Sequence, residues 1–72
     1  MRLKDLREDS DLTQQVIAEY LNIKQNTYCQ YERDLRQISI DLLIRLAEFY
    51  NVSVDYILNL TNIKEPYPKD YV

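Results

Sequence analysis

Residues 12–33 read LTQQVIAEYLNIKQNTYCQYER, a pattern typical of two short amphipathic helices with a polar joint between them. At about 100° per residue, Tyr28 and Tyr31 lie on one side of the second helix. The opposite side carries polar or small side chains, namely Gln25, Asn26, Cys29, Gln30 and Arg33. We therefore expect the second helix to bury two aromatic rings and to expose its carboxamides.

An exposed face of this kind suits the reading of base edges in the major groove of double-stranded DNA. Each Gln or Asn carboxamide carries a donor and an acceptor on one planar group, which matches N6 and N7 of adenine. Catalysis has no obvious use for such a face. The thiol of Cys29 is expected to be a small, groove-facing or half-buried group; the alternative is a redox sensor, favoured only by the nearby Lys24 and Arg33.

The chain outside this segment also predicts helices. The sequence contains no glycine, and its prolines, Pro66 and Pro68, lie near the C-terminus. We expect a compact all-α domain over residues 1–60, with helices near residues 2–9, from 14 to the joint at 22, from 24 or 25 to 33, from 40 to about 50, and from 54 to about 60. Residues 61–72 predict an extended C-terminal tail, because the residue before a proline avoids the helical region. This tail is either loose or packs as an arm on a partner subunit.

Polar residues predict where these helices begin and end. Thr13, Ser39 and Ser53 are the expected N-caps, and Asn22 and Asp34 are the expected left-handed residues at two helix ends. The apolar side chains expected to face the core are Leu3, Leu6, Ile17, Ala18, Leu21, Ile40, Leu43, Leu46, Ala47, Tyr50, Val54, Ile57 and Leu58.

Composition limits the class of protein. The chain has 72 residues, of which 46% are hydrophobic and 29% charged, as in one soluble globular domain. No apolar run approaches the roughly 20 residues of a membrane span, and the charged start MRLKDLRED is not a signal peptide. Histidine is absent and Cys29 has no internal disulfide partner, so we expect no metal, no cofactor and a cytoplasmic location. With no nucleophile–base pair and no glycine phosphate loop, an enzyme is not expected.

The overall charge counts against nucleic-acid binding. The net charge is −3 and the pI is about 4.7, whereas DNA-binding domains usually carry a basic patch. Residues 22–37 nevertheless carry Lys24, Arg33 and Arg36 against Glu32 and Asp34, three positive charges against two negative. Because salt at 0.1 M screens charges over roughly 10 Å, this local balance matters more than the total. The acidity therefore weakens the DNA hypothesis without removing it.

The order of several short motifs resembles the phage-repressor and Cro-type helix-turn-helix family, the xenobiotic-response-element class of regulators. The motifs are LTQ at residues 12–14, the Ala18 and Leu21 pair, YER at 31–33 and NVSVDYIL at 51–58. The likeness covers residues 1 to about 60 and implies a five-helix repressor-like domain whose second and third helices form the helix-turn-helix. It also implies a nucleoid-associated transcriptional regulator, by expectation a repressor, that binds a near-palindromic operator as a homodimer.

The resemblance assigns roles to residues of the two central helices. Gln25, Asn26 and Gln30 match positions whose side chains reach bases, and Cys29 lies between them. The residues implied to contact phosphate or backbone are Gln14, Lys24, Thr27, Arg33 and Arg36. A further pair, Arg7 and Glu32, matches residues that join the first helix to the third in some relatives.

The chain departs from the pattern of this family at four positions. Asn22 and Asp34 stand where glycine is common, and Tyr28 stands where a smaller aliphatic residue is typical. Lys24 replaces the usual serine or threonine cap of the third helix, which costs about 1 kcal/mol but adds a cation beside the DNA. These departures concern affinity and the choice of site, and leave the expected fold unchanged.

A homodimer is expected because one helix reads only about four or five base pairs, so a single small acidic domain would bind weakly. Two-fold pairing would present two recognition helices about 34 Å apart on successive major-groove faces. The predicted contact surface carries Val52, Tyr56, Asn59 and Leu60. A chain of this size leaves no ligand-sensing domain, so no small-molecule ligand is expected, and control would come from a protein antagonist or toxin, proteolysis, concentration or competition at the operator.

The alternative function is a protein-interaction module with the same fold. In this hypothesis the domain binds another regulator as an antirepressor or antitoxin partner, with weak or no DNA binding. The acidic pI and the missing cap at Lys24 favour it.

Overall fold

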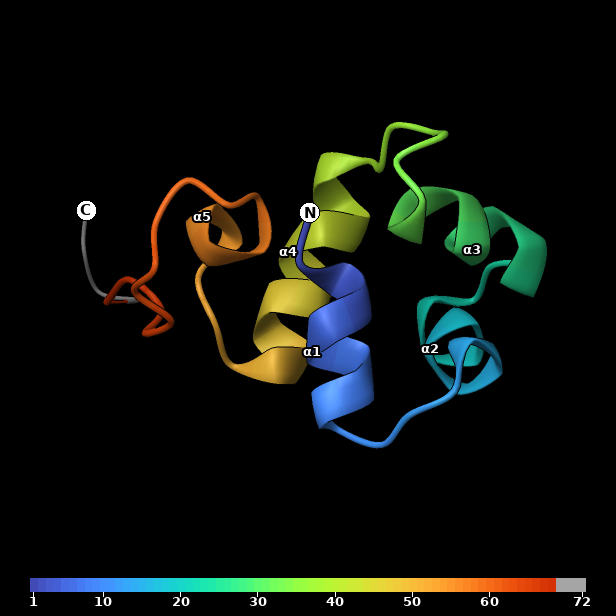
Figure 1. Ribbon diagram of the computed structural model, residues 1–72, viewed down its shortest axis with the longest axis horizontal. Coiled ribbons are helices and arrows are strands. Elements are labelled where there is room, and N and C mark those ends of the chain that lie inside the picture. The colour runs from blue at the N-terminus through green and yellow to red at the C-terminus, as the bar shows by residue number, and fades with distance from the viewer. Residues whose placement is uncertain (69–72) are drawn as a thin grey trace.

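Five helices make up the fold, in the order that the sequence predicts (Figure 1). The structure, a computed structural model, describes residues 1–68, and these residues contain no strand. The helices are α1 (Leu3–Asp9), α2 (Gln14–Leu21), α3 (Gln25–Glu32), α4 (Ile40–Tyr50) and α5 (Val54–Ile57). The prediction of an all-α domain is therefore confirmed. None of these helices is long and apolar enough to cross a membrane.

Side-chain caps begin three of the helices. The hydroxyls of Thr13 and Ser39 each accept a hydrogen bond at 3.2 Å from the backbone N–H three residues later, at the starts of α2 and α4. Ser53 Oγ does the same for Tyr56 N–H at 3.0 Å, at the start of α5. All three predicted N-caps are confirmed. Lys24, at the start of α3, makes no such bond, although its backbone is extended (φ −72°, ψ 144°) as an N-cap requires.

Asparagine and aspartate take the left-handed positions for which other chains use glycine. Asn22 ends α2 at φ 58°, and Asp34 follows α3 at φ 56°, as predicted. Three further residues with positive φ are Asp11, Asn51 and Asn59. Short polar side chains tolerate this region better than other non-glycine residues. The chain can therefore turn sharply after a helix although it contains no glycine.

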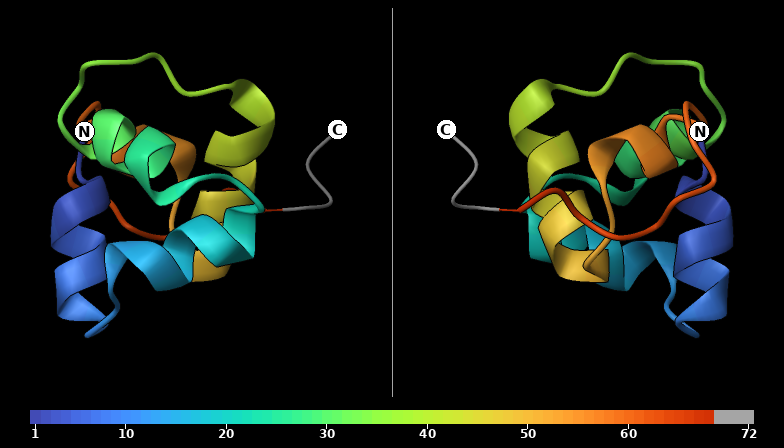
Figure 2. Two further views of the ribbon diagram at one scale, coloured as in Figure 1. Left: turned by 90° about the vertical axis from the view of Figure 1, so that its right-hand side faces the viewer. Right: turned by 90° about the vertical axis from the view of Figure 1, so that its left-hand side faces the viewer.

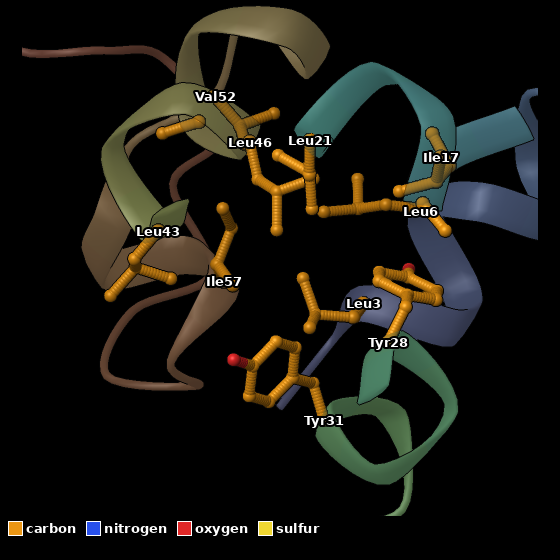
Figure 3. Close-up of a cluster of buried hydrophobic side chains, with 12 residues drawn as sticks. Leu3, Leu6, Ile17, Leu21, Tyr28, Tyr31, Leu43, Leu46, Val52 and Ile57 are labelled. Carbon is orange, nitrogen blue, oxygen red and sulfur yellow. The ribbon is translucent and has the colours of Figure 1, made fainter. Parts of the chain in front are cut away.

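The core lies where the inner faces of all five helices meet (Figure 3). Tyr28 and Tyr31 extend from α3 toward Leu3 of α1, and both rings are buried. The complete buried set is Leu3, Leu6, Ile17, Ala18, Leu21, Tyr28, Tyr31, Leu43, Leu46, Ala47, Val52 and Ile57. Each large apolar side chain contributes about 1.5–3 kcal/mol when it is fully removed from water. Because α3 supplies two aromatic rings to this core, packing holds its orientation.

One residue expected in the core lies outside it. Ile40 has 73% of its surface exposed, so the prediction that it faces inward is wrong. Ile40 is the first residue of α4, whereas Leu43, three residues later, is only 7% exposed. The three-to-four spacing along α4 was correct, but a spacing does not say how much of a helix the other helices cover. The other predicted core residues are all buried or half-buried.

Residues 61–68 contain no helix and pack back on the start of the chain and on α5 (Figure 2). Arg2 Nη1 donates to the carbonyl of Thr61 at 2.7 Å, and Ser53 N–H donates to the carbonyl of Lys64 at 2.8 Å. The Tyr67 hydroxyl donates to the carboxylate of Asp55 on α5. The described part of the tail is thus bonded to its own domain rather than loose. Residues 69–72 of the predicted tail lie outside the described residues.

Candidate nucleic-acid interface

The helix-turn-helix is formed by α2 and α3, which pack against each other across the turn at Asn22. In Figure 1 they lie at one end of the long axis, and α5 and the C-terminal segment lie at the other. α2 contributes Ile17, Ala18 and Leu21 to the core, and α3 contributes its two tyrosines. The outer side of α3 is therefore presented at one end of the molecule.

The side chains of α3 divide as the sequence predicts. Tyr28 is 0% exposed and Tyr31 is 6% exposed, so the phenolic side is fully anchored. Gln25 and Asn26 in the first turn are exposed, whereas Cys29 and Gln30 in the next turn are half-buried. The structure thus places the four predicted base-reading residues on the accessible side of one helix. Their carboxamides can offer paired donors and acceptors to a partner in front of α3.

The predicted phosphate contacts surround this reading face. Lys24 at the start of α3, Arg33 at its end and Arg36 in the following loop are exposed, and Thr27 is half-buried. Gln14 lies in the first turn of α2, where backbone N–H groups and the helix dipole favour an anion. Its side chain is half-buried and already bonded within the protein, which the sequence did not indicate.

A buried polar network connects Gln14 to two other helices. Glu32 of α3 accepts hydrogen bonds from Arg7 Nε at 2.6 Å and from Arg7 Nη2 at 3.2 Å, both reaching across from α1. Gln14 Nε2 donates to the same carboxylate at 3.0 Å, and Arg7 Nη1 donates to the carbonyl of Leu12 at 2.9 Å. The Glu32 side chain is only 3% exposed. The predicted Arg7–Glu32 pair between the first and third helices is therefore present, with Gln14 as a third member.

This network keeps the Glu32 carboxylate charged. Burial alone would raise the pKa of Glu32, but the hydrogen bonds from Arg7 and then from Gln14 outweigh burial, and the pKa lies below its ordinary value. The same carboxylate raises the pKa of Arg7 further. A buried charge of this kind is tolerated only while its partners are present.

Two tyrosine hydroxyls lie buried beside the network. Tyr28 Oη and Tyr50 Oη have no hydrogen-bond partner among the described residues. Burial, and then the neighbouring Glu32 carboxylate, raise the pKa of Tyr28, although its hydroxyl does not meet the geometry of a hydrogen bond to that carboxylate. Burial also raises the pKa of Tyr50 to about 12. Both phenols are therefore neutral groups of the core.

Several arginines are used inside the protein. Arg2 donates to backbone carbonyls of α5 and of the C-terminal segment, and Arg7 is held by Glu32. Arg45 of α4 donates to the carbonyl of Tyr20 at 2.7 Å and to that of Leu21 at 3.4 Å, and so caps the end of α2. This cap could not be expected from the sequence, because the two helices are joined only by tertiary contact. The positive charge beside α3 therefore comes from the exposed Lys24, Arg33 and Arg36.

The four residues predicted to form a dimer interface do not share one environment. Val52 is only 6% exposed and belongs to the core, so its assignment to the interface is wrong. The Val52 N–H donates to the carbonyl of Ala47, near the end of α4. The Val52 side chain packs in the core. Tyr56 is half-buried, with the Arg2 guanidinium 4.0 Å from its ring centre. Asn59 and Leu60 are exposed, Leu60 to 71%.

A groove of about 480 Å³ is lined mainly by the segment that joins α3 to α4, together with the N-terminus and Leu58 at the end of α5. Its apolar lining includes Leu35 and Ile40, which are 65% and 73% exposed. The lining residues are Met1, Asp34, Leu35, Arg36, Gln37, Ile38, Ile40, Leu43 and Leu58. The N-terminal ammonium group lies 3.5 Å from the Asp34 carboxylate at its edge.

Comparison with known proteins identifies the family. The sequence pattern of the Helix-turn-helix family matches residues 3–57, from α1 to the end of α5. The transcriptional regulator ImmR of Bacillus subtilis (strain 168) is 42% identical over 64 residues, which are 89% of this chain and 50% of ImmR. An uncharacterized regulator of the same species, YobD, is 42% identical over 65 residues, 90% of this chain and 58% of YobD.

A phage protein is also similar. The cryptic phage CTXphi transcriptional repressor RstR of Vibrio cholerae is 32% identical over 66 residues, which are 89% of this chain and 60% of RstR. The chain thus spans between half and three fifths of the length of these relatives. No solved structure matches the chain significantly. From the family pattern, the relatives and the five-helix fold, we conclude that this chain belongs to the helix-turn-helix family.

Proposed function

We propose that this protein is a sequence-specific, double-stranded-DNA-binding transcriptional regulator that places α3 in the major groove. The observation that carries the proposal is the division of α3, with two buried tyrosines behind an accessible face of carboxamides. A surface helix anchored in this way offers its polar face to a partner without loss of packing. The relatives ImmR and RstR are named a transcriptional regulator and a transcriptional repressor, which supports the same function and favours repression.

The chemistry of the reading face favours adenine. A Gln or Asn carboxamide accepts from N6 and donates to N7 of adenine at once, and each such pair contributes about 1–3 kcal/mol of discrimination against a wrong base. Gln25, Asn26 and Gln30 supply three such groups, and Cys29 between them is small enough to let the helix approach the base edges. The operator half-site should therefore contain adenines at positions opposite these residues.

Contacts with the DNA backbone would come from both helices of the motif. Lys24, Arg33 and Arg36 provide three exposed cations per domain, and Gln14 and Thr27 provide neutral donors. Each neutralised phosphate releases condensed counterions, so three contacts predict a slope of roughly −2.7 in log affinity against log salt for each half-site. Between 50 and 200 mM salt this slope corresponds to about a 40-fold loss of affinity per half-site.

We further propose that two copies bind a near-palindromic operator, and that the protein is cytoplasmic and associated with the nucleoid. With Val52 excluded, the proposed contact surface comprises Tyr56, Asn59 and Leu60 together with the neighbouring groove that Leu35 and Ile40 line. Exposed leucine and isoleucine side chains gathered at one place are typical of a surface that another protein covers. Pairing through this surface would double the number of bases read and offset the weak binding of one small domain.

Selection from a random pool of duplex oligonucleotides tests the proposal. The protein should enrich an inverted repeat with adenine-containing half-sites, and a mobility shift on this repeat should weaken steeply from 50 to 200 mM salt. A protein-interaction module of the same fold would enrich no repeat and show no such slope. The acidic pI of about 4.7 favours this second function, in which the partner would be another regulator or a toxin. Failure to enrich any sequence would reject DNA recognition in favour of it.

A further inference from the structure

Gln14 is not a free surface side chain, although it occupies the position proposed to contact a phosphate. Its Nε2 lies 3.0 Å from Glu32 Oε1, so one of its two amide N–H groups is already used. Glu32 belongs to α3 and Gln14 to α2, which means that the bond joins the two helices of the motif directly. The bond lies between residues 18 positions apart in the chain.

The identity of the acceptor decides which way the Gln14 amide faces. A carboxamide has a donating nitrogen and an accepting oxygen of similar size, and rotation by 180° exchanges them. An ionised carboxylate accepts only, so Glu32 selects the orientation in which the Gln14 nitrogen is turned toward it. The second N–H on that same nitrogen stays available for a phosphate oxygen. The reverse orientation would bring the amide oxygen next to two anions.

The carboxylate is itself held in place. Arg7 bonds to both of its oxygens, at 2.6 and 3.2 Å, and also bonds to the Leu12 carbonyl at 2.9 Å, just before α2. The Arg7 side chain is 13% exposed and the Glu32 side chain 3% exposed, so little solvent competes for these bonds. Charge-assisted bonds of this kind are stronger and more directional than neutral ones. The Glu32 oxygen that meets Gln14 is therefore fixed relative to α1, α2 and α3.

We infer that Glu32 is a positioning residue for DNA binding, which holds the Gln14 amide with its nitrogen ready to donate to a backbone phosphate. The inference rests on the proposed DNA-binding function and adds to it, because Glu32 touches no DNA itself. It assigns the buried carboxylate a second role beside its ion pair with Arg7. Because Glu32 belongs to α3 and Gln14 to α2, their bond fixes the position of the phosphate contact of α2 relative to the base-reading face of α3.

The inference predicts an effect opposite to that of simple electrostatics. Removing a negative charge from a DNA-binding domain should strengthen binding, because repulsion from the phosphates decreases. If Glu32 orients Gln14, the Glu32→Gln substitution should instead weaken binding, since a glutamine at this position can donate and so allows the Gln14 amide to turn around. Glu19→Gln is the matched control: Glu19 is exposed on α2, and its substitution removes the same charge.

A double-mutant cycle on the selected operator tests the inference. We expect Gln14→Met and Glu32→Gln each to weaken binding about fivefold, the range of one hydrogen bond, and Glu19→Gln to leave it equal or stronger. In the Gln14→Met background, Glu32→Gln should cause no further loss, because there is no amide left to orient. A loss from Glu32→Gln that is the same in both backgrounds would overturn the inference, as would a gain from Glu32→Gln. If the unsubstituted protein binds no selected DNA, it is the proposed function that fails.

Stability is measured on the same proteins, because Glu32→Gln weakens the pair with Arg7. Affinities are compared only at temperatures where circular dichroism shows each variant folded. If Glu32→Gln does not fold, Glu32→Asp replaces it: this variant keeps the charge and an acceptor for Arg7, but withdraws the carboxylate from Gln14 by one methylene. Glu32→Asp should then weaken DNA binding about as much as Gln14→Met, and the two losses should not add. Unchanged binding by folded Glu32→Asp would overturn the inference.

Discussion

Glu32 is a buried carboxylate on a helix whose outer face is polar. It lies on a helix that must offer a polar outer face, yet its own carboxylate is buried beside Tyr28 and satisfied by Arg7 and Gln14. Removing Arg7 would leave the buried Glu32 charge without an ionic partner, which is strongly destabilising. The network therefore joins α3, through Glu32 near its end, to Arg7 of α1 and Gln14 of α2.

The buried carboxylate predicts a loss of stability in acid. The ordinary pKa of Glu32 is 4.5, and its pKa in the folded protein is lower. A group of this kind contributes its full stability above the unfolded pKa and loses it as the pH falls through the folded pKa. Urea unfolding at a series of pH values should give a free energy of unfolding that falls below about pH 4.5. In Glu32→Gln the fall should be smaller, and an equal fall in both proteins would contradict the prediction.

The reading face makes a separate prediction. Gln25→Ala and Gln30→Ala should each cost about 1–3 kcal/mol of binding free energy and relax the preference for one base pair of the half-site. The thermal unfolding temperature should stay unchanged, because neither carboxamide supports the core. Gln15→Ala, which removes an exposed carboxamide from α2, is the control and should alter neither property. Undiminished binding by the Gln25→Ala, Gln30→Ala double variant would show that another face of α3 meets the DNA.

At the scale of single helices, the ends are specified by short polar residues. α2, α4 and α5 begin at side-chain caps, and α2 and α4 end at left-handed asparagines, Asn22 and Asn51. α3 differs because Lys24 supplies an extended backbone but no capping acceptor. The start of α3 thus lacks the stabilisation of a side-chain cap, but it carries a cation at the start of the proposed recognition helix.

This exchange at Lys24 can be measured. Lys24→Ser should stabilise the domain by about 0.5–1 kcal/mol, because a serine hydroxyl can accept from the N–H of Thr27. The same change should reduce the salt slope of DNA binding by about 0.9 per half-site. Lys4→Ser removes an exposed lysine inside α1, where no cap is possible, and should not stabilise. Thermal unfolding together with mobility shifts at several salt concentrations would measure both effects, and a Lys24→Ser protein no more stable than its parent would contradict the first.

At the scale of the whole molecule, the two ends of the long axis have different surfaces. One end presents α2 and α3, and the other presents α5 with the C-terminal segment bonded to it (Figure 1). Because Arg2, Ser53 and Asp55 hold this segment, it adds to the domain rather than reaching away from it. Two exposed apolar groups, Leu60 after α5 and Ile40 at the start of α4, belong to the surface that we propose a second copy covers.

If the protein self-associates through this surface, a charged residue introduced there should weaken dimer formation. Leu60→Glu should weaken dimer formation about 10- to 150-fold, the equivalent of the roughly 1.5–3 kcal/mol that burial of a leucine contributes. Ile44→Glu is a suitable control, because Ile44 is half-exposed on α4 and belongs neither to the groove nor to the proposed contact residues Tyr56, Asn59 and Leu60. Sedimentation equilibrium with and without operator DNA would separate the two variants. A strictly monomeric parent protein at high micromolar concentration would contradict pairing altogether.

The pattern of residues along the chain was enough to predict the five helices and several of their ends. The caps at Thr13, Ser39 and Ser53 and the left-handed Asn22 and Asp34 all occur where predicted. Each of these features depends on atoms no more than about four residues apart, so it is written in the local sequence. For the same reason, the buried and exposed sides of α3 followed from helical periodicity alone.

Contacts between distant residues decided the rest. Val52 is buried and Ile40 exposed because of where other helices pass, which periodicity along one helix does not encode. The bond from Gln14 to Glu32 joins positions 18 residues apart. The Arg45 cap on α2 joins positions 25 residues apart, and the bond from Arg2 to Thr61 joins positions 59 residues apart. Such pairs form only when the core brings the helices together, and the same core determines which polar groups remain free to meet a partner.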